Sequence, residues 1–160
     1  MPRKKGPGKH RANGSGEETI DYGPLDHWVG FNLRMAQAAA FQAFARLAEE
    51  VGSRPGRFAT LMLIGRNPGI SQTALSRANG RDKSTLTPVL NDLEKRGLIR
   101  RQRTREDQRV YRLTLTPEGR KLLRQLVACA RRHERNLDRI IGSGEQTAFV
   151  RILRRIAAQA

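Results

Sequence analysis

The sequence predicts a mainly α-helical fold with a small β-hairpin, which is an α+β class. Apolar residues recur at helical spacing along most of the chain, two short helices are separated by a tight turn, and one segment alternates apolar and polar residues as a strand does. A length of 160 residues with 38% hydrophobic residues suits one domain with one core and an added helical layer.

Residues 1–20 form the first segment, which is rich in Lys, Arg, Gly and Pro and has no apolar period. Such a composition predicts a disordered basic N-terminal arm. Two interpretations stay open, a solubilising tail and an arm that contacts a polyanion.

The next two helices follow from apolar spacing and from the residues that interrupt it. A long first helix is predicted from Pro24 to about Glu50, with the apolar positions Leu25, Trp28, Val29, Leu33, Ala36, Ala40, Phe44 and Leu47. Gly and Pro residues at 52–56 end it, and a second helix is predicted from Arg57 to about Gly65.

Two short helices then lie close together. Ser71 is a suitable N-cap for a helix over 72–78, and Asn79-Gly80-Arg81 is too short and too turn-prone to continue it. Asp82 caps a further helix, Lys83 to Arg96, whose buried side carries Leu86, Leu90, Leu93 and Leu98. Two helices joined by a tight Gly-containing turn are a helix-turn-helix.

A charged hairpin follows. Leu98-Ile99 and residues 110–115 are predicted to be strands, and the segment between them bears many arginines. Three helices followed by such a hairpin describe a winged helix. The hairpin has only two acids against the arginines Arg100, Arg101, Arg103, Arg105, Arg109 and Arg112. Like charges at this density repel one another unless a polyanion neutralises them.

Two helices are predicted to complete the chain. Thr116 as N-cap and Pro117 at the first helical position start a helix that runs to about Ile141, where Gly142-Ser143-Gly144 ends it. The last helix, over 145–158, is expected to turn Phe149, Ile152, Leu153 and Ile156 inward. Both helices are too long and too one-sided for so small a domain to cover, so a second copy of the chain is the simplest partner.

The predicted organisation therefore has four parts. They are a basic arm at 1–20, an N-terminal dimerisation helix at 21–56, a winged helix-turn-helix at 57–116 and C-terminal dimerisation helices at 117–160.

The charge balance narrows the partners. Lys and Arg total 31 against 15 Asp and Glu, a formal charge of +16, which indicates nucleic acid or an anionic membrane. Aromatic residues make up 5% of the chain, which is few for a protein that stacks single-stranded bases. No apolar run approaches the roughly 20 residues that span a bilayer, and the N-terminus lacks the apolar part of a secretion signal. We expect a soluble, cytoplasmic protein without a membrane partner.

No catalytic site is indicated. The sequence shows no nucleophile with an obvious base, no metal-ligand spacing and no phosphate-cradling glycine loop, and its three histidines form no recognisable set. The single cysteine, Cys129, excludes an internal disulfide and is expected to be a buried, inert thiol. We therefore expect no enzyme activity, no metal and no cofactor.

Double-stranded DNA is the partner that suits a winged helix with this charge. Short hydrogen-bonding side chains at the start of the helix over 83–96 fit base edges in a major groove, and an arginine at a hairpin tip fits a narrow minor groove. Asp107 lies two residues before Arg109 and could fix its direction. The residues expected to contact DNA are Ser71, Gln72, Thr73, Lys83, Ser84, Thr85, Thr87, Pro88, Asn91, Arg101, Arg103, Arg105, Asp107 and Arg109.

Two segments, SQTALSRANGRDKSTLTPVLNDLEKRGLIRR at 71–101 and EDQRVYRLTLTPEGRKL at 106–122, resemble the MarR family of dimeric winged-helix transcription regulators. The likeness extends from Leu25 to about Ile156 and includes the Asp-x-Arg motif of the wing and its Leu-Thr-x-x-Gly ending. It implies that the helix over 83–96 lies in the major groove, that Arg109 enters the minor groove, and that the first and last two helices interlock with a second subunit.

The resemblance also implies a small aromatic or anionic ligand, such as an aromatic acid or its thioester, between the dimer layer and the DNA-reading part. Aromatic walls and anion clamps for it are available at His27, Trp28, Phe31, Arg34, Arg57 and Phe58. The alternative is ordinary interface packing by these residues, and His133 is expected to be an interface histidine.

The sequence thus predicts a homodimeric, sequence-specific transcription regulator, a repressor that reads a pseudo-palindromic operator and is released by a ligand. The alternative is an architectural protein that coats DNA with little sequence preference, with the basic arm and the wing supplying charge.

Overall fold

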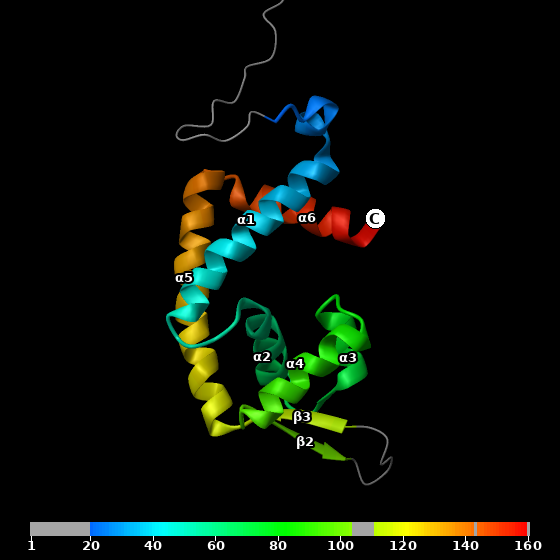
Figure 1. Cartoon of the computed structure of the whole chain (residues 1–160), viewed down its shortest axis with the longest axis vertical. Helices are drawn as coiled ribbons and strands as arrows, with labels where there is room; N and C mark the ends of the chain where they lie inside the picture. The colour runs from blue at the N-terminus through cyan, green and yellow to red at the C-terminus, as the bar shows by residue number, and fades with distance from the viewer. Residues whose placement is uncertain (1–19, 104–110, 143, 160) are drawn as a thin grey trace, which may run out of the picture. The chain divides into compact units, whose positions relative to one another are not determined.

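The computed structural model describes residues 20–103, 111–142 and 144–159. The chain divides into two compact units, residues 1–38 and 39–160, with the boundary inside the first long helix. Figure 1 shows the course of the chain.

The first unit begins with a turn of 3-10 helix, Gly23–His27, and continues into α1, Val29–Glu49. The long helix therefore starts later than predicted. Gly23 has a positive φ of 53°, its N–H donates to the Asp21 carboxylate at 2.8 Å, and Trp28 is extended, so the chain turns before it can enter an α-helix. Pro24, from which the helix was predicted, lies in the 3-10 turn.

The second unit takes the end of α1 and then α2, Pro55–Arg66, α3, Gln72–Ala78, and α4, Lys83–Lys95. After the strands β2, Ile99–Arg103, and β3, Tyr111–Leu115, come α5, Pro117–Ile141, and α6, Gln146–Gln159. Three helices followed by a hairpin of strands confirm the predicted winged-helix order, including both short helices of the helix-turn-helix.

The sheet has three antiparallel strands in the order β1-β3-β2. The first, β1, is Ile70–Ser71 and was not predicted, because two residues are too few to show an alternating pattern. It pairs Ile70 with Leu113 of β3. The strand predicted at Leu98-Ile99 is β2, which starts at Ile99 and is longer than expected, because five residues pair with β3, from Ile99 opposite Leu115 to Arg103 opposite Tyr111.

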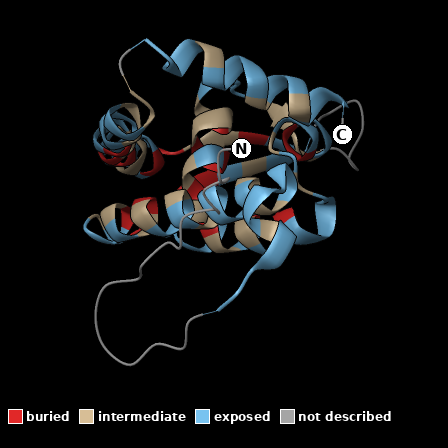
Figure 2. Cartoon of the chain, turned by 90° about the horizontal axis from the view of Figure 1, so that it is seen from above, coloured by how far each residue is buried: buried red, intermediate tan, exposed pale blue. Residues whose placement is uncertain are grey.

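The core of the second unit joins the helices to one face of the sheet. Its fully buried side chains are mainly leucines and isoleucines of α2, α3, α4, β2, β3 and α5, and Figure 2 shows the buried residues in red. The predicted buried side of α4 is confirmed. The largest of these side chains are Leu61, Ile64, Leu75, Leu86, Leu90, Leu93, Ile99, Leu113 and Leu126.

The three predicted helix N-caps are confirmed. The side chains of Ser71, Asp82 and Thr116 each accept a hydrogen bond from the backbone N–H three residues later, at the start of α3, α4 and α5 respectively. At the other end of α5, Gly142 has a φ of 100° and stops the helix as expected.

Cys129 and His133 of α5 are both buried by residues of the same chain. Cys129 is buried, and its thiol donates to the backbone oxygen of Leu47 at 3.2 Å. His133 is buried as well, with its ring 5.8 Å from that of Phe44, so residues of the same chain already cover the expected interface histidine.

The inward direction predicted for four residues of α6 is wrong for Phe149 and Ile152 in the single chain, whereas Leu153 and Ile156 are half-buried. No residue of α6 is buried, and Phe149 and Ile152 are 41% and 43% exposed. Phe149 and Ile152 have the helical spacing of a buried face but stay exposed in the described chain. Among the described helices, none combines the length and apolar character needed to cross a membrane.

Candidate nucleic-acid interface

The turn between α3 and α4 is fixed by side chains. Gly80 adopts a φ of 61°, which a glycine reaches without strain. Asn79 donates to the Thr60 hydroxyl of α2 at 3.1 Å, and the Ser76 hydroxyl donates to the backbone oxygen of Arg81. These bonds tie the turn to α2 and set the direction in which α4 leaves it.

The start of α4 is held by Asp82. One carboxylate oxygen of Asp82 accepts from the Thr85 N–H and from the Ser84 hydroxyl, both at 2.7 Å. The backbone hydrogen bond from Thr85 and the side-chain bond from Ser84 lower the pKa of Asp82 from 3.8 to about 2. Lys83, Ser84 and Thr85 are exposed, so the first turn of α4 presents short polar groups to solvent.

Pro88 lies inside α4 without ending it. Proline has no N–H, so the backbone oxygen of Ser84 loses its usual partner. One residue earlier, the Thr87 hydroxyl donates to the backbone oxygen of Lys83 at 2.7 Å and also accepts from the Gln72 amide nitrogen at 2.9 Å. Thr87 therefore links α4 to the start of α3.

Ser71 and Thr73, which were also predicted to contact DNA, flank Gln72 at the start of α3. Ser71 is half-buried and uses its side chain as the N-cap, and Thr73 is exposed. Gln72 is half-buried.

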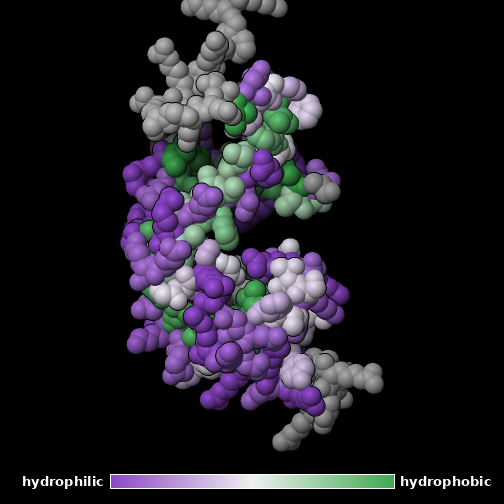
Figure 3. Space-filling model, in the orientation of Figure 1, coloured by the Kyte–Doolittle hydropathy of each residue, from purple (hydrophilic) through white to green (hydrophobic). Residues whose placement is uncertain are grey.

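The described part of the hairpin carries exposed arginines. Arg100 and Arg103 of β2 and Arg112 of β3 are exposed, and the surface over these strands is predominantly hydrophilic (Figure 3). The Arg103 guanidinium lies 5.5 Å from the ring centre of Tyr111 and donates to its hydroxyl at 3.2 Å, while Arg112 donates to the backbone oxygen of Gly69. The aromatic and backbone partners limit the positions that these cations can take.

The tip of the hairpin, residues 104–110, lies outside the described residues. The predicted contacts of Arg105, Asp107 and Arg109 lie there, and so does the expected pairing of Asp107 with Arg109. All three stay predictions.

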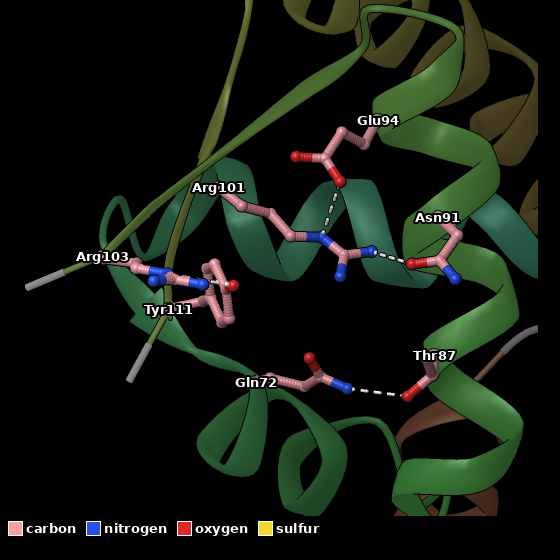
Figure 4. A network of polar contacts seen from close by, with 7 residues as sticks. All are labelled: Gln72, Thr87, Asn91, Glu94, Arg101, Arg103 and Tyr111. Carbon is pink, nitrogen blue, oxygen red and sulfur yellow. Dashed lines mark hydrogen bonds and ion pairs between the residues drawn. The ribbon is translucent and has the colours of Figure 1, made fainter. Parts of the chain in front are cut away.

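Arg101 differs from its neighbours because it turns toward α4. Its guanidinium donates to the Asn91 amide oxygen at 2.6 Å, and its Nε lies 3.1 Å from a Glu94 carboxylate oxygen. The Arg101 side chain is 13% exposed, so it is a bridge between the strand and the helix (Figure 4). Sequence reasoning grouped Arg101 with the other arginines and missed Glu94. Strand alternation carried the signal, since Arg101 shares its side of β2 with buried Ile99.

Arg57 forms a second link to α4. Its guanidinium, 7% exposed, lies 2.6 Å from the Asp92 carboxylate. Burial lowers the pKa of Arg57, and the charge of Asp92 opposes that shift. The sequence suggested that Arg57 could bind an anionic ligand, but it gave no sign that the guanidinium is already paired with Asp92.

The predicted ligand residues divide between the two units. In the first unit, Trp28 is 58% exposed, His27 is exposed, and Arg34 lies 5.1 Å from the ring centre of Phe31. In the second, the Phe58 ring lies 5.4 Å from that of Phe44. That the six residues line one ligand site stays a prediction.

A shallow depression of about 540 Å³ opens on the second unit and contains none of these six residues. It is lined by Val51, Gly52, Arg96, Leu98, Glu118, Lys121, Leu122 and Gln125.

Comparison with known proteins gives consistent matches. Residues 54–111 match the family model described as MarR family. A putative transcriptional regulatory protein for the hcr operon of Thauera aromatica is 33% identical over 154 residues, which cover 94% of this chain and 93% of that protein. The transcriptional repressor CouR bound to a 23-mer DNA duplex matches with a TM-score of 0.81 and 32% identity, over 88% of this chain and 99% of CouR. CouR bound to p-coumaroyl-CoA matches with the same TM-score and coverage at 30% identity.

Proposed function

The chain belongs to the MarR family, and we propose that it is a homodimeric transcription repressor that binds a pseudo-palindromic DNA operator. The observation that carries the proposal is the exposed, capped start of α4, which lies in the same unit as a hairpin of exposed arginines. Similarity to CouR in its DNA-bound form supports double-stranded DNA as the polyanion.

In the proposed complex, α4 occupies the major groove. Lys83, Ser84 and Thr85 face out at its start, where the positive end of the helix dipole favours phosphate and short hydroxyl groups reach base edges. Asn91 is one helical turn beyond Thr87 and is exposed. Pro88 is exposed between them and offers an apolar contact for a thymine methyl group.

The hairpin contacts the adjoining backbone and minor groove. Exposed Arg103 holds a phosphate, and Arg109, in the part of the hairpin outside the described residues, enters the minor groove. Arg105 and the Asp107 carboxylate complete this contact, with Asp107 fixing the direction of Arg109.

The proposed dimer explains the uncovered apolar residues of each unit. In the second unit, α6 exposes Phe149, Val150 and Ile152 at 37–43% although their spacing is that of a buried face. In the first unit, Trp28 and Val29 are 58% and 70% exposed. In the proposed dimer a second copy buries these residues, and a palindromic operator requires its two α4 helices to lie about one helical turn of DNA apart, roughly 10 bp.

A small aromatic or anionic ligand is proposed to release the operator. CouR with p-coumaroyl-CoA supports an aromatic acid or its thioester as the chemical class. Arg57 couples ligand binding to DNA binding in this proposal. An anion that draws its guanidinium away from Asp92 removes a contact that holds α4 in place. The residues proposed for the site are His27, Trp28, Phe31, Arg34, Arg57 and Phe58.

Selection of bound duplexes from a random pool tests the proposal. We expect one short palindrome, protected as a single footprint, and its release by an aromatic acid or thioester. Uniform protection of arbitrary duplex would instead support an architectural protein that coats DNA, the class that the charge of +16 also permits.

Two variants extend the test. Arg109→Ala should weaken binding to sites with A·T-rich flanks more than Arg135→Ala, which removes the same charge from an exposed position on α5. Equal losses in the two variants would place the hairpin tip away from the minor groove. Deletion of residues 1–20 should flatten the salt dependence of binding if the arm holds phosphates, and an unchanged slope would make it a tail.

A further inference from the structure

The surface formed by α3, α4 and β2 holds two amide side chains, each tied to the protein by one end. The Asn91 amide oxygen faces Arg101, and the Gln72 amide nitrogen faces Thr87 (Figure 4). An untied amide can turn over and exchange donor for acceptor. These two amides are prevented from doing so by the chemistry of their partners.

Arg101 fixes the first amide. A guanidinium carries donors and no acceptor, so the Asn91 atom 2.6 Å from it has to be the oxygen. The Glu94 carboxylate forms an ion pair with this guanidinium, with one oxygen 3.1 Å from an Nε that has no hydrogen-bond partner among the described residues, and the Arg101 side chain is 13% exposed. Among the described residues, none accepts a hydrogen bond from the Asn91 nitrogen, which leaves its two N–H groups for a partner outside the chain.

Thr87 fixes the second amide. Its single hydroxyl hydrogen is given to the backbone oxygen of Lys83 at 2.7 Å, and a carbonyl oxygen can only accept. Toward Gln72 the hydroxyl must therefore accept, so Gln72 presents its nitrogen at 2.9 Å. Within the described part of the chain, nothing donates to the Gln72 amide oxygen, and this oxygen is an acceptor for an outside partner.

We propose that Arg101 and Thr87 are positioning residues that set the base preference of the protein by making Asn91 a donor and Gln72 an acceptor. The proposal rests on the DNA-binding function proposed above. In the major groove, guanine and thymine present acceptors where adenine and cytosine present an amino group. Adenine also presents the acceptor N7, so the fixed donor disfavours only cytosine, and the fixed acceptor selects adenine or cytosine at a different base pair.

The proposal runs against the usual behaviour of asparagine in DNA recognition. A free Asn turns its oxygen and nitrogen to the same adenine edge and binds both N6 and N7. Here the Asn91 oxygen points toward β2, so the two atoms cannot both meet one base edge. Loss of Arg101 should release the amide and move the preference toward adenine.

Arg101→Met tests the proposal, with Arg100→Met as the matched control. Methionine keeps an unbranched, flexible stem like that of arginine without its donors. Arg100 is the preceding residue of β2, is exposed on the opposite side of the strand, and loses the same charge when replaced. The base pair that Asn91 contacts is the one at which Asn91→Ala removes the preference among single-base variants of the selected operator.

At that base pair we expect the wild type and Arg100→Met to disfavour cytosine relative to the other three bases by about 2- to 10-fold, the value of one hydrogen bond. In Arg101→Met adenine should become the preferred base, because the released amide binds both N6 and N7. The proposal is overturned if Arg101→Met keeps the profile of Arg100→Met, if both variants lose the preference alike, or if Asn91→Ala changes no base pair.

Thr87→Val is an independent test of the proposal, because valine keeps the shape of threonine and removes the hydroxyl. It should abolish the preference for adenine or cytosine at the base pair mapped by Gln72→Ala and leave the pair mapped by Asn91→Ala unchanged. An unaltered profile would refute the role of Thr87. A wild-type protein that selects no sequence at all would instead refute the proposed function, and far-UV circular dichroism with thermal unfolding confirms that each variant is folded.

Discussion

Replacement of Gly119 by alanine should be among the most destabilising single-methyl additions in this protein. Gly119 is buried at the third position of α5, where the Leu-Thr-x-x-Gly sequence ends. An added Cβ would lie 1.9 Å from the backbone oxygen of Leu98 and 2.9 Å from its carbonyl carbon. Contacts under 3.0 Å are essentially never made by Cβ atoms, so α5 and Leu98 would have to separate by about 1 Å.

The backbone of Leu98 has little freedom to give way. Its oxygen accepts from the Thr116 N–H at 3.1 Å, and its N–H donates to Leu93 at 2.9 Å. Separation strains the first of these bonds, worth about 0.5–1.5 kcal/mol, and the Thr116 cap on the Gly119 N–H, worth about 0.5–2 kcal/mol. Overpacking adds about 1–3 kcal/mol, and the better helix propensity of alanine returns about 1 kcal/mol. We expect a net loss of about 1–5.5 kcal/mol.

Urea unfolding followed by circular dichroism measures this loss. The protein concentration must be equal for all variants, because association contributes to the apparent stability of a dimer. Gly56→Ala is the control, since a Cβ there meets only the end of the Arg81 side chain, at 3.4 Å, and the expected change is between zero and a gain of about 1 kcal/mol. A loss below about 1 kcal/mol in Gly119→Ala would show that the joint between α4 and α5 is looser than the structure indicates.

Three further outcomes follow from single contacts. Asp92→Asn leaves Arg57 buried without its counter-charge, so it should destabilise the protein by about 1–2 kcal/mol in urea unfolding. The loss is smaller than for a fully buried pair because Asp92 is 42% exposed. No change in stability would mean that water already screens the pair. The pKa of Asp82 is about 2 in the folded protein and about 3.9 in unfolded chains, so its stabilisation is complete above pH 4 and is lost as the pH falls toward 2. Asp82→Asn keeps the cap but has no group that titrates, so the thermal midpoint of the variant should rise relative to that of the wild type as the pH falls from about 4 to about 2. Parallel plots of thermal midpoint against pH would contradict the lowered pKa of Asp82. Cys129 should react with a thiol reagent at least about tenfold faster in urea than in the native protein, because the native thiol is buried and bonded to Leu47; equal rates would contradict its burial.

Sequence patterns predicted the elements whose causes are local. The caps at Ser71, Asp82 and Thr116 need only a side-chain oxygen and a backbone N–H three residues away, so they were recognisable from residue type and spacing. The errors fall where local signals compete or are too short. The two residues of β1 show no period, and the apolar spacing near Pro24 resembled a helix although the chain there forms a 3-10 turn.

The candidate site divides in the same way. The exposed start of α4 followed from its cap and its apolar period, and the arginines of the hairpin followed from composition. The direction of Arg101, by contrast, depends on the placement of β2 against α4, which brings Asn91 and Glu94 within reach. The pairing of Arg57 with Asp92 joins residues 35 positions apart and needs α2 and α4 to pack first.

The sequence by itself determined where α3, α4 and α5 begin, which of their faces are apolar, and how much positive charge the chain carries. Those properties arise from contacts within a few residues and from simple summation of charge. Tertiary structure alone decided which polar groups are already used inside the protein and which are left for a partner. A hydrogen bond consumes one donor and one acceptor, so the free ends of Gln72 and Asn91 are defined only once Thr87 and Arg101 have taken the others.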